Sequence, residues 1–163
     1  MSARIDMDWN SVVADIVASR GDGQTALIPI LQDIQLSYGY VPAEAQMEIA
    51  KALNLSGARV SEVISFYSFL TDEPQGKFVF RLCQTISCEM KGKEEVGRAL
   101  ESALGISFGE TSEDGLFSLE FTNCIGMCDQ PPAMLVNDDV YGDLTPEGIA
   151  EIVADYRRKG DEL

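Results

Sequence analysis

Apolar residues recur at helical spacing through the N-terminal part of the chain. Four segments place apolar side chains three or four positions apart, which predicts four amphipathic helices. Gly21 and Gly39 stand just past two of these segments, Ser56 is an N-cap candidate, and Pro42 suits a first helical turn. The segments and their expected buried residues are 8–21 (Trp9, Val12, Val13, Ile16, Val17), 25–39 (Leu27, Ile30, Leu31, Ile34), 42–56 (Met47, Ile49, Leu53) and 56–70 (Val60, Val63, Ile64 and Phe66 or Tyr67).

The pattern changes after a linker at residues 71–77. Aromatic and branched residues then predict two strands, and a helix with a 3.6-residue period separates them. A hairpin around Asn137 and a last helix that begins at Thr145 and Pro146 complete the chain. The expected elements are strand 77–83, helix 93–105 (Val96, Leu100 and Leu104 inward), strand 116–124, hairpin 133–144, and helix 146–159 (Ile149, Ile152, Val153 and Tyr156 inward).

The order of these elements predicts the topology of the second half. Two strands joined by a helix form a parallel pair with a right-handed crossover. The hairpin and last helix then complete a trimmed thioredoxin-like arrangement. The expected fold class is therefore mixed α+β and α/β, with an N-terminal helical bundle at residues 1–72 and a thioredoxin-like domain at residues 73–163.

Composition and charge narrow the classes of partner. The chain has 163 residues, 45% of them hydrophobic, and a formal net charge of −15, which disfavours nucleic acid and anionic membranes as partners. No apolar run reaches the roughly 18 residues of a membrane-spanning helix, and the start of the chain does not resemble a secretory signal. We therefore expect a cytoplasmic protein without membrane insertion. Its cysteines should serve metal binding or catalysis, because disulfides are rare in a reducing compartment.

The candidate metal-binding or catalytic side chains are four cysteines. The chain contains no histidine, which excludes imidazole-based acid–base and nucleophilic catalysis and every metal site that needs imidazole. Cys83 ends the first predicted strand and Cys88 lies in the loop after it, while Cys124 ends the second strand and Cys128 lies in its loop. Carboxyl ends of neighbouring parallel strands meet at one rim of a sheet, so we expect the four thiols to converge.

The cysteine spacing favours an iron–sulfur cluster but leaves alternatives open. Four residues separate Cys83 from Cys88, and three separate Cys124 from Cys128. Cysteine pairs in zinc sites usually have about two to four intervening residues, whereas about four also opens the plant-type 2Fe-2S ligand set. Structural zinc and unliganded or redox-active thiols therefore remain as alternatives. A Cys-x-x-Cys oxidoreductase is disfavoured because the chain has no such pair.

Several segments together resemble a known family. "CQTISC" matches its first cysteine motif, "CIGMCDQPP" its second, "LIPILQDIQLSYGYVPAEAQMEIAKAL" and "VSEVISFYSFL" its helical N-terminal region, and "DLTPEGIAEIV" its last helix. The chain resembles the thioredoxin-like 2Fe-2S ferredoxin subunit of NADH dehydrogenases, a group that includes the small peripheral subunit of respiratory complex I. Related subunits occur in NAD(P)-linked hydrogenases and formate dehydrogenases.

The resemblance implies a function and a set of ligands. It implies that Cys83, Cys88, Cys124 and Cys128 bind one 2Fe-2S cluster, so that the chain carries single electrons and is not catalytic alone. It also implies a partner subunit that binds FMN and NAD(P), within a larger oxidoreductase such as complex I, a hydrogenase, a formate dehydrogenase or a bifurcating enzyme. Many members carry a histidine after the second cysteine, where this chain has Glu89. The alternative from another class is a structural zinc module that assembles a complex.

Two further expectations concern backbone and nucleotides. Pro131 and Pro132 precede a predicted strand, a place where thioredoxin-like folds often have a cis proline, whereas base rates for X-Pro bonds favour trans, so cis stays open as an alternative. The segment "GDGQTAL" lacks the third glycine and the preceding strand of a dinucleotide-binding motif, so we expect no flavin or NAD(P) site in this chain.

Overall fold

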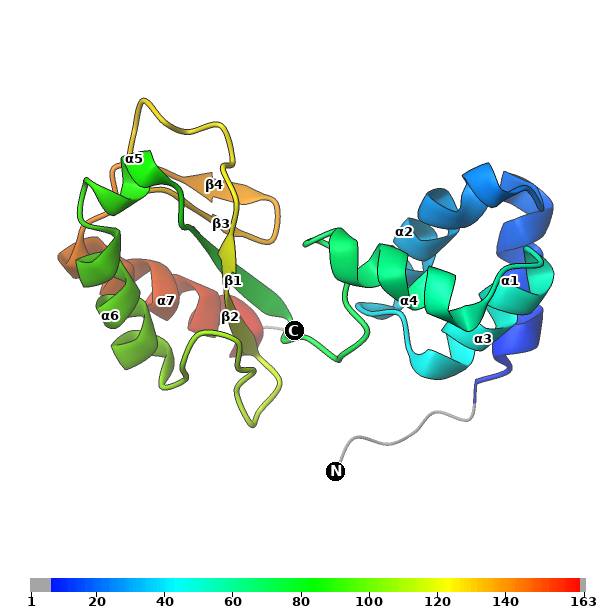
Figure 1. The fold of residues 1–163 in the computed structure, drawn as a ribbon. Coiled ribbons are helices and arrows are strands. Elements are labelled where there is room, and N and C mark those ends of the chain that lie inside the picture. The colour runs from blue at the N-terminus through cyan, green and yellow to red at the C-terminus, as the bar shows by residue number, and fades with distance from the viewer. Residues whose placement is uncertain (1–6, 162–163) are drawn as a thin grey trace. The chain divides into compact units, whose positions relative to one another are not determined.

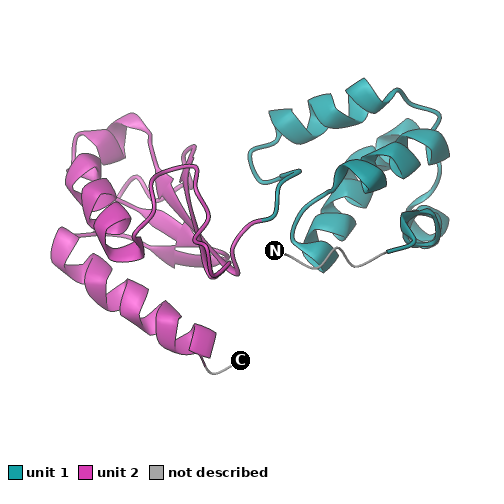
Figure 2. Cartoon of the chain, turned by 90° about the horizontal axis from the view of Figure 1, so that it is seen from below, with its two compact units in different colours: residues 1–74 teal, residues 75–163 magenta. Residues whose placement is uncertain are grey.

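A computed structural model describes residues 7–161. The chain divides into two compact units, residues 1–74 and residues 75–163, which are coloured separately in Figure 2. Figure 1 shows that the first unit is built from helices, whereas the second contains a sheet with helices. Each unit is described by itself below.

The first unit follows the helical periodicity of its sequence. It contains α1 (Trp9–Arg20), the 3-10 helix η1 (Gln24–Ala26), α2 (Leu27–Tyr38), α3 (Ala43–Ala52) and α4 (Gly57–Phe66). The Asp8 side chain accepts a hydrogen bond from the Ser11 N–H at the start of α1, and Ser56 accepts one from the Arg59 N–H at the start of α4. Gly39 ends α2 in the left-handed conformation that glycine adopts without strain. The four predicted helices are thus confirmed.

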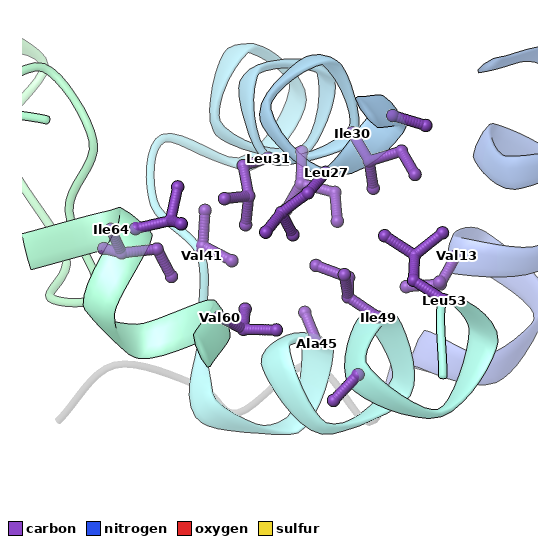
Figure 3. Close-up of a cluster of buried hydrophobic side chains, with 14 residues drawn as sticks. Val13, Leu27, Ile30, Leu31, Val41, Ala45, Ile49, Leu53, Val60 and Ile64 are labelled. Carbon is purple, nitrogen blue, oxygen red and sulfur yellow. The ribbon is translucent and has the colours of Figure 1, made fainter. Parts of the chain in front are cut away.

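The apolar faces of these helices form one buried cluster. Figure 3 shows labelled side chains from all four α-helices pointing toward one another, with Ile30, Leu31 and Ile49 fully buried. Two expectations are wrong: Met47 is 54% exposed and Phe66 is 78% exposed. On α3, Ala45, Ile49 and Leu53 share the inward face at four-residue spacing, which turns Met47 outward. Phe66 is the last residue of α4, and Tyr67 just beyond it is also exposed.

The second unit is a mixed sheet with helices. Its elements are β1 (Phe78–Cys83), α5 (Ile86–Glu89), α6 (Lys93–Leu104), β2 (Phe117–Thr122), β3 (Met134–Val136), β4 (Asp139–Tyr141) and α7 (Pro146–Asp161). The strand order is β2-β1-β3-β4. β1 pairs with β2 in parallel, from Phe78 opposite Phe117 to Cys83 opposite Thr122, and the other two pairings are antiparallel. This arrangement confirms the predicted parallel unit, hairpin and last helix.

One face of this sheet carries the core of the second unit. Alternate strand residues, including Phe80, Phe117 and Met134, share a cluster with the inward residues of α6 and α7. Phe80 is fully buried and meets the rings of Phe117 and Tyr156 edge-on. Because side chains alternate across a strand, Arg81 and Cys83 lie on the opposite side of β1 from Phe80 and Leu82. The predicted inward residues Val96, Leu100 and Leu104 are buried as expected.

The hairpin is tied to the rest of the unit by side chains. The Asn137 side chain accepts a hydrogen bond from the Val79 N–H and donates one to the Lys77 carbonyl. The Tyr156 hydroxyl donates to Asp139 Oδ2 at 2.6 Å, so α7 holds β4. Burial, followed by hydrogen bonds with Asp139 and Tyr141, raises the pKa of Tyr156.

Two further observations complete the fold. The peptide bond between Pro131 and Pro132 is cis, which is the alternative that base rates disfavoured. Within residues 7–161, no helix has the length and apolar character needed to cross a membrane.

Candidate metal centre

The four cysteines lie at the carboxyl ends of the parallel strands. Cys83 is the last residue of β1, and Cys124 and Cys128 lie in the loop that follows β2. Cys88, expected in a loop, lies in the short helix α5 instead, because the chain turns into helix immediately after extended Thr85. Cys124 comes two residues after β2 ends and not at its end. Figure 1 shows α5 and the loop after β2 at the same end of the sheet.

Cys124 and Cys128 form the first close pair. Their sulfur atoms are 3.3 Å apart. The Gly126 N–H donates to Cys124 Sγ with an N-to-S distance of 3.4 Å. Gly126 has a φ of 85°, which only glycine adopts readily, so its backbone can turn the N–H toward the sulfur. A backbone donor in this position stabilises negative charge on a thiolate.

Cys83 and Cys88 form the second pair. Both lie in one small buried cluster, and Cys83 Sγ lies 3.1 Å from Thr85 Oγ1. The Cys83 N–H donates to the Ala133 carbonyl at 3.0 Å, and Ile125 packs against the cluster that contains Cys83 and Cys88. Ala133 and Ile125 belong to the segment around the other cysteine pair, so these contacts connect the two pairs.

Packing and strand register make the two pairs neighbours. Ile125 and Met127, which lie between Cys124 and Cys128, pack against the cluster of Cys83, Cys88 and Ala133. Cys83 also stands opposite Thr122 at the end of β2. Four thiols from two separate strand ends therefore gather at one rim, as the parallel topology predicts. Among the described residues, no three Cys, Asp or Glu side chains are placed to hold a single metal ion, so the thiols converge as two pairs and not as one preformed four-ligand site.

Each pair contains one thiol that ionises more readily than the other. Burial raises the pKa of Cys83, but hydrogen bonds from Thr85, Cys88 and the backbone outweigh it, so the net pKa is lowered. Burial is the largest cause that raises the pKa of its partner Cys88. In the other pair, the Gly126 N–H is the largest cause that lowers the pKa of Cys124, whereas the hydrogen bond with Cys124 raises that of Cys128.

The two pairs differ in their exposure to solvent. Cys83 and Cys88 are each only 2% exposed and form a small apolar cluster with Ala133, against which Ile125 and Met127 pack. Cys124 and Cys128 are exposed. A metal group bound here would therefore have one side enclosed by protein and one side near the surface.

The donor set fits a two-iron cluster. Four thiols without imidazole supply the ligands of a 2Fe-2S centre, in which each iron takes two protein ligands. The Cys124 and Cys128 sulfurs are already 3.3 Å apart, and the Gly126 N–H points at the sulfur of Cys124. Hydrogen bonds to the sulfurs are among the features that set the potential of such a cluster.

Sequence reasoning missed the hydroxyl groups at the site. Thr85 hydrogen bonds with Cys83 and also lowers the pKa of Cys124, and a hydrogen bond from Ser87 lowers that of Cys128. Both residues lie inside the first cysteine motif, between Cys83 and Cys88. The sequence could have indicated these hydroxyl groups, because Thr85 and Ser87 are the second and fourth of the four residues between Cys83 and Cys88.

Comparison with known proteins gives a consistent result. Residues 13–157 match the family model described as thioredoxin-like 2Fe-2S ferredoxin. The chain is 35% identical over 135 residues to a component of the NADH-quinone oxidoreductase of Pseudomonas aeruginosa, covering 83% of this chain and 81% of that component.

Two further similarities involve longer proteins. The chain is 38% identical over 149 residues to the alpha subunit of the NAD-reducing hydrogenase HoxS of Cupriavidus necator, covering 91% of this chain. It spans only 25% of that subunit's length. A crystal structure of an air-oxidised NAD+-reducing NiFe hydrogenase shares the fold with a TM-score of 0.67 and 22% identity, over 79% of this chain and 23% of the other.

Proposed function

Because the chain belongs to the thioredoxin-like 2Fe-2S ferredoxin family, whose cofactor is a 2Fe-2S cluster, we propose that it is an electron-transfer subunit and that Cys83, Cys88, Cys124 and Cys128 bind the cluster. The observation that carries the assignment is the convergence of two thiol pairs at one rim of the sheet. When bound, the cluster accepts and releases one electron at a time.

The residues around the thiols favour the thiolate state that ligation requires. The Gly126 N–H and the Thr85 hydroxyl lower the pKa values of Cys124 and Cys83, so one ligand of each pair gives up its proton first. Ala133, Ile125 and Met127 keep water from the buried pair. The exposed pair leaves that side of the centre within reach of an electron donor or acceptor.

We propose a flavoprotein as the partner, one that binds FMN and NAD(P) within a larger oxidoreductase complex. Support comes from the relatives, which are subunits of an NADH-quinone oxidoreductase and an NAD-reducing hydrogenase. NAD(P)H donates a hydride with two electrons, whereas the cluster takes one, so a flavin must stand between them. The cytoplasm is the proposed location, because free thiols persist under its reducing conditions.

The domain boundaries also belong to the proposal. We assign residues 1–72 to an N-terminal helical bundle and residues 73–163 to the thioredoxin-like 2Fe-2S domain. The change from a helical to a mixed α and β pattern supports this assignment, as does the presence of all four cysteines in the second region. The bundle carries exposed apolar side chains on α2 and α4, such as Leu36 and Phe66, and contributes no ligand.

Single replacement of each cysteine by serine tests the ligand assignment. Each variant should lose or reshape the cluster, because an alkoxide is a harder and more basic ligand than a thiolate. Iron content, acid-labile sulfide and the reduced-state EPR spectrum are measured for the wild type and the four variants. Ser107→Ala is a matched control away from the cysteines. A cysteine variant with a wild-type EPR signal contradicts the four-cysteine assignment, and a colourless wild-type protein containing zinc contradicts the electron-transfer function.

A further inference from the structure

Lys93 occupies a position that its local structure disfavours. It is the first residue of α6, where the positive end of the helix dipole repels a cation. Its side chain is only 17% exposed, although a lysine ammonium is strongly hydrated. A residue that its local structure disfavours is often kept in place by a functional or tertiary contact. The contacts of the Lys93 ammonium identify that requirement.

The ammonium contacts both cysteine-bearing segments. It forms an ion pair with the Glu89 carboxylate, and Glu89 immediately follows Cys88. The same Nζ lies 5.3 Å from the centre of the Phe121 ring, within the range of a cation–π interaction. Phe121 lies near the end of β2, three residues before Cys124. One side chain therefore links the segment of Cys88 to the segment of Cys124.

The aromatic end of this link is itself held in place. The Phe121 ring stacks on Phe108, with ring centres 3.8 Å apart and planes inclined by 4°. The Phe108 N–H donates to Glu101 of α6, and a Cβ on Gly97 would stand 3.4 Å from the Phe108 ring. The ring under Lys93 thus stacks on Phe108, and it is Phe108 that packs against α6.

We propose that Lys93 is a positioning residue, which holds the segments of Cys88 and Cys124 in the mutual arrangement that the cluster needs. The inference rests on the proposed ligation by the four cysteines. Glu89, which stands where many family members have a histidine, serves as the ionic partner of Lys93 in this arrangement.

The test compares Lys93→Met with Lys91→Met in the cluster-loaded full chain. Both changes remove one positive charge close to Cys88, but Lys91 is exposed. Iron release to a chelator should be roughly tenfold faster in Lys93→Met, the factor that corresponds to about 1.4 kcal/mol. It should be unchanged in Lys91→Met. The reduced-state EPR g-values should shift only in Lys93→Met, and Lys93→Arg should restore both properties because arginine also pairs with carboxylates and stacks on rings.

A double-mutant cycle examines the link to the ring. Phe121→Leu keeps an apolar side chain and the Lys93–Glu89 pair but removes the aromatic face. Lys93→Met and Phe121→Leu should be non-additive in the rate of iron release, because either change breaks the same contact. If Lys93→Met does not fold, as judged by circular dichroism, Phe121→Leu alone carries the comparison with Lys91→Met.

The outcomes separate this inference from the proposed function. The positioning role is overturned if the wild type binds its cluster but Lys93→Met and Lys91→Met release iron at equal rates. Additive effects of Lys93→Met and Phe121→Leu on the rate of iron release also overturn it. A wild-type chain that takes up no iron and sulfide overturns the proposed function, and the inference falls with it.

Discussion

A single methyl group added at Gly76 should strongly destabilise the second unit, residues 75–163. Gly76 lies just before β1 and passes directly over the first residue of β2. A Cβ added there would stand 2.5 Å from the Phe117 carbonyl carbon and 2.8 Å from both its Cα and its nitrogen. The Gly76 N–H also donates to Ser118 Oγ at 2.7 Å, and Ser118 is 2% exposed. The neighbouring atoms are backbone atoms of a paired strand, so they cannot rotate aside.

The expected magnitude follows from these distances. Carbon atoms pack best at about 3.5–4.0 Å, so the Gly76→Ala variant must open this contact by roughly 1 Å. Overpacking of this kind costs about 1–3 kcal/mol. Loss of the hydrogen bond to the buried Ser118 hydroxyl adds about 1 kcal/mol. A total of about 2–4 kcal/mol corresponds to a fall in Tm of roughly 10–30 °C for a domain of this size.

The assay is thermal unfolding of the cluster-loaded protein, followed by far-UV circular dichroism and by the visible absorbance of the cluster. Gly148→Ala is the matched control. Its added Cβ would lie 3.5 Å from Thr145 Oγ1, an ordinary contact, in the first turn of α7. Alanine in a helix is about 0.5–1 kcal/mol more favourable than glycine, so this control should raise Tm slightly. Equal Tm values for Gly76→Ala and the wild type would refute the reasoning.

Two other predictions concern electron supply and pH. The cluster of the purified chain should be reduced by dithionite but not by NADH or NADPH, and addition of the flavoprotein partner should make reduction by the nucleotide possible. The measurement is an anaerobic visible spectrum of the chain mixed with NADH. Rapid bleaching by NADH alone contradicts the prediction. Tyr156, whose pKa is raised, keeps its proton in the folded state above pH 10, where an unfolded tyrosine ionises at about pH 10. The free energy of unfolding should therefore fall as pH rises through this range, by up to about 1.4 kcal/mol per pH unit. Tyr156→Phe should lose this part of the pH dependence in urea titrations, and an unchanged slope is the contrary result.

Most of the fold could be predicted because periodicity reports directly on which face of an element is buried. The helices around Ile30 and Val60 and the strand around Phe80 lie where the pattern places them. Met47 and Phe66 could not be assigned in this way, because the exposure of an apolar side chain depends on whether a neighbour covers it.

The placement of the four cysteines could be predicted from the sequence, whereas their surroundings could be predicted only in part. Parallel strands carry their ends to one rim, so the positions of Cys83 and Cys124 follow from topology. The Thr85 hydroxyl could have been noticed from its place between two cysteines. The contact of Lys93 with Phe121 could not, because it joins an N-terminal helix position to a strand end across the βαβ unit.

The two apolar clusters described above have no residue in common. Every buried member of the first comes from residues 13–64, and every buried member of the second from residues 78–156. Substitutions at well-separated sites with no shared partners change stability additively. A substitution near Ile30 should therefore change the stability of the first unit while the packing around Phe80, from which β1 carries Cys83, stays as it is.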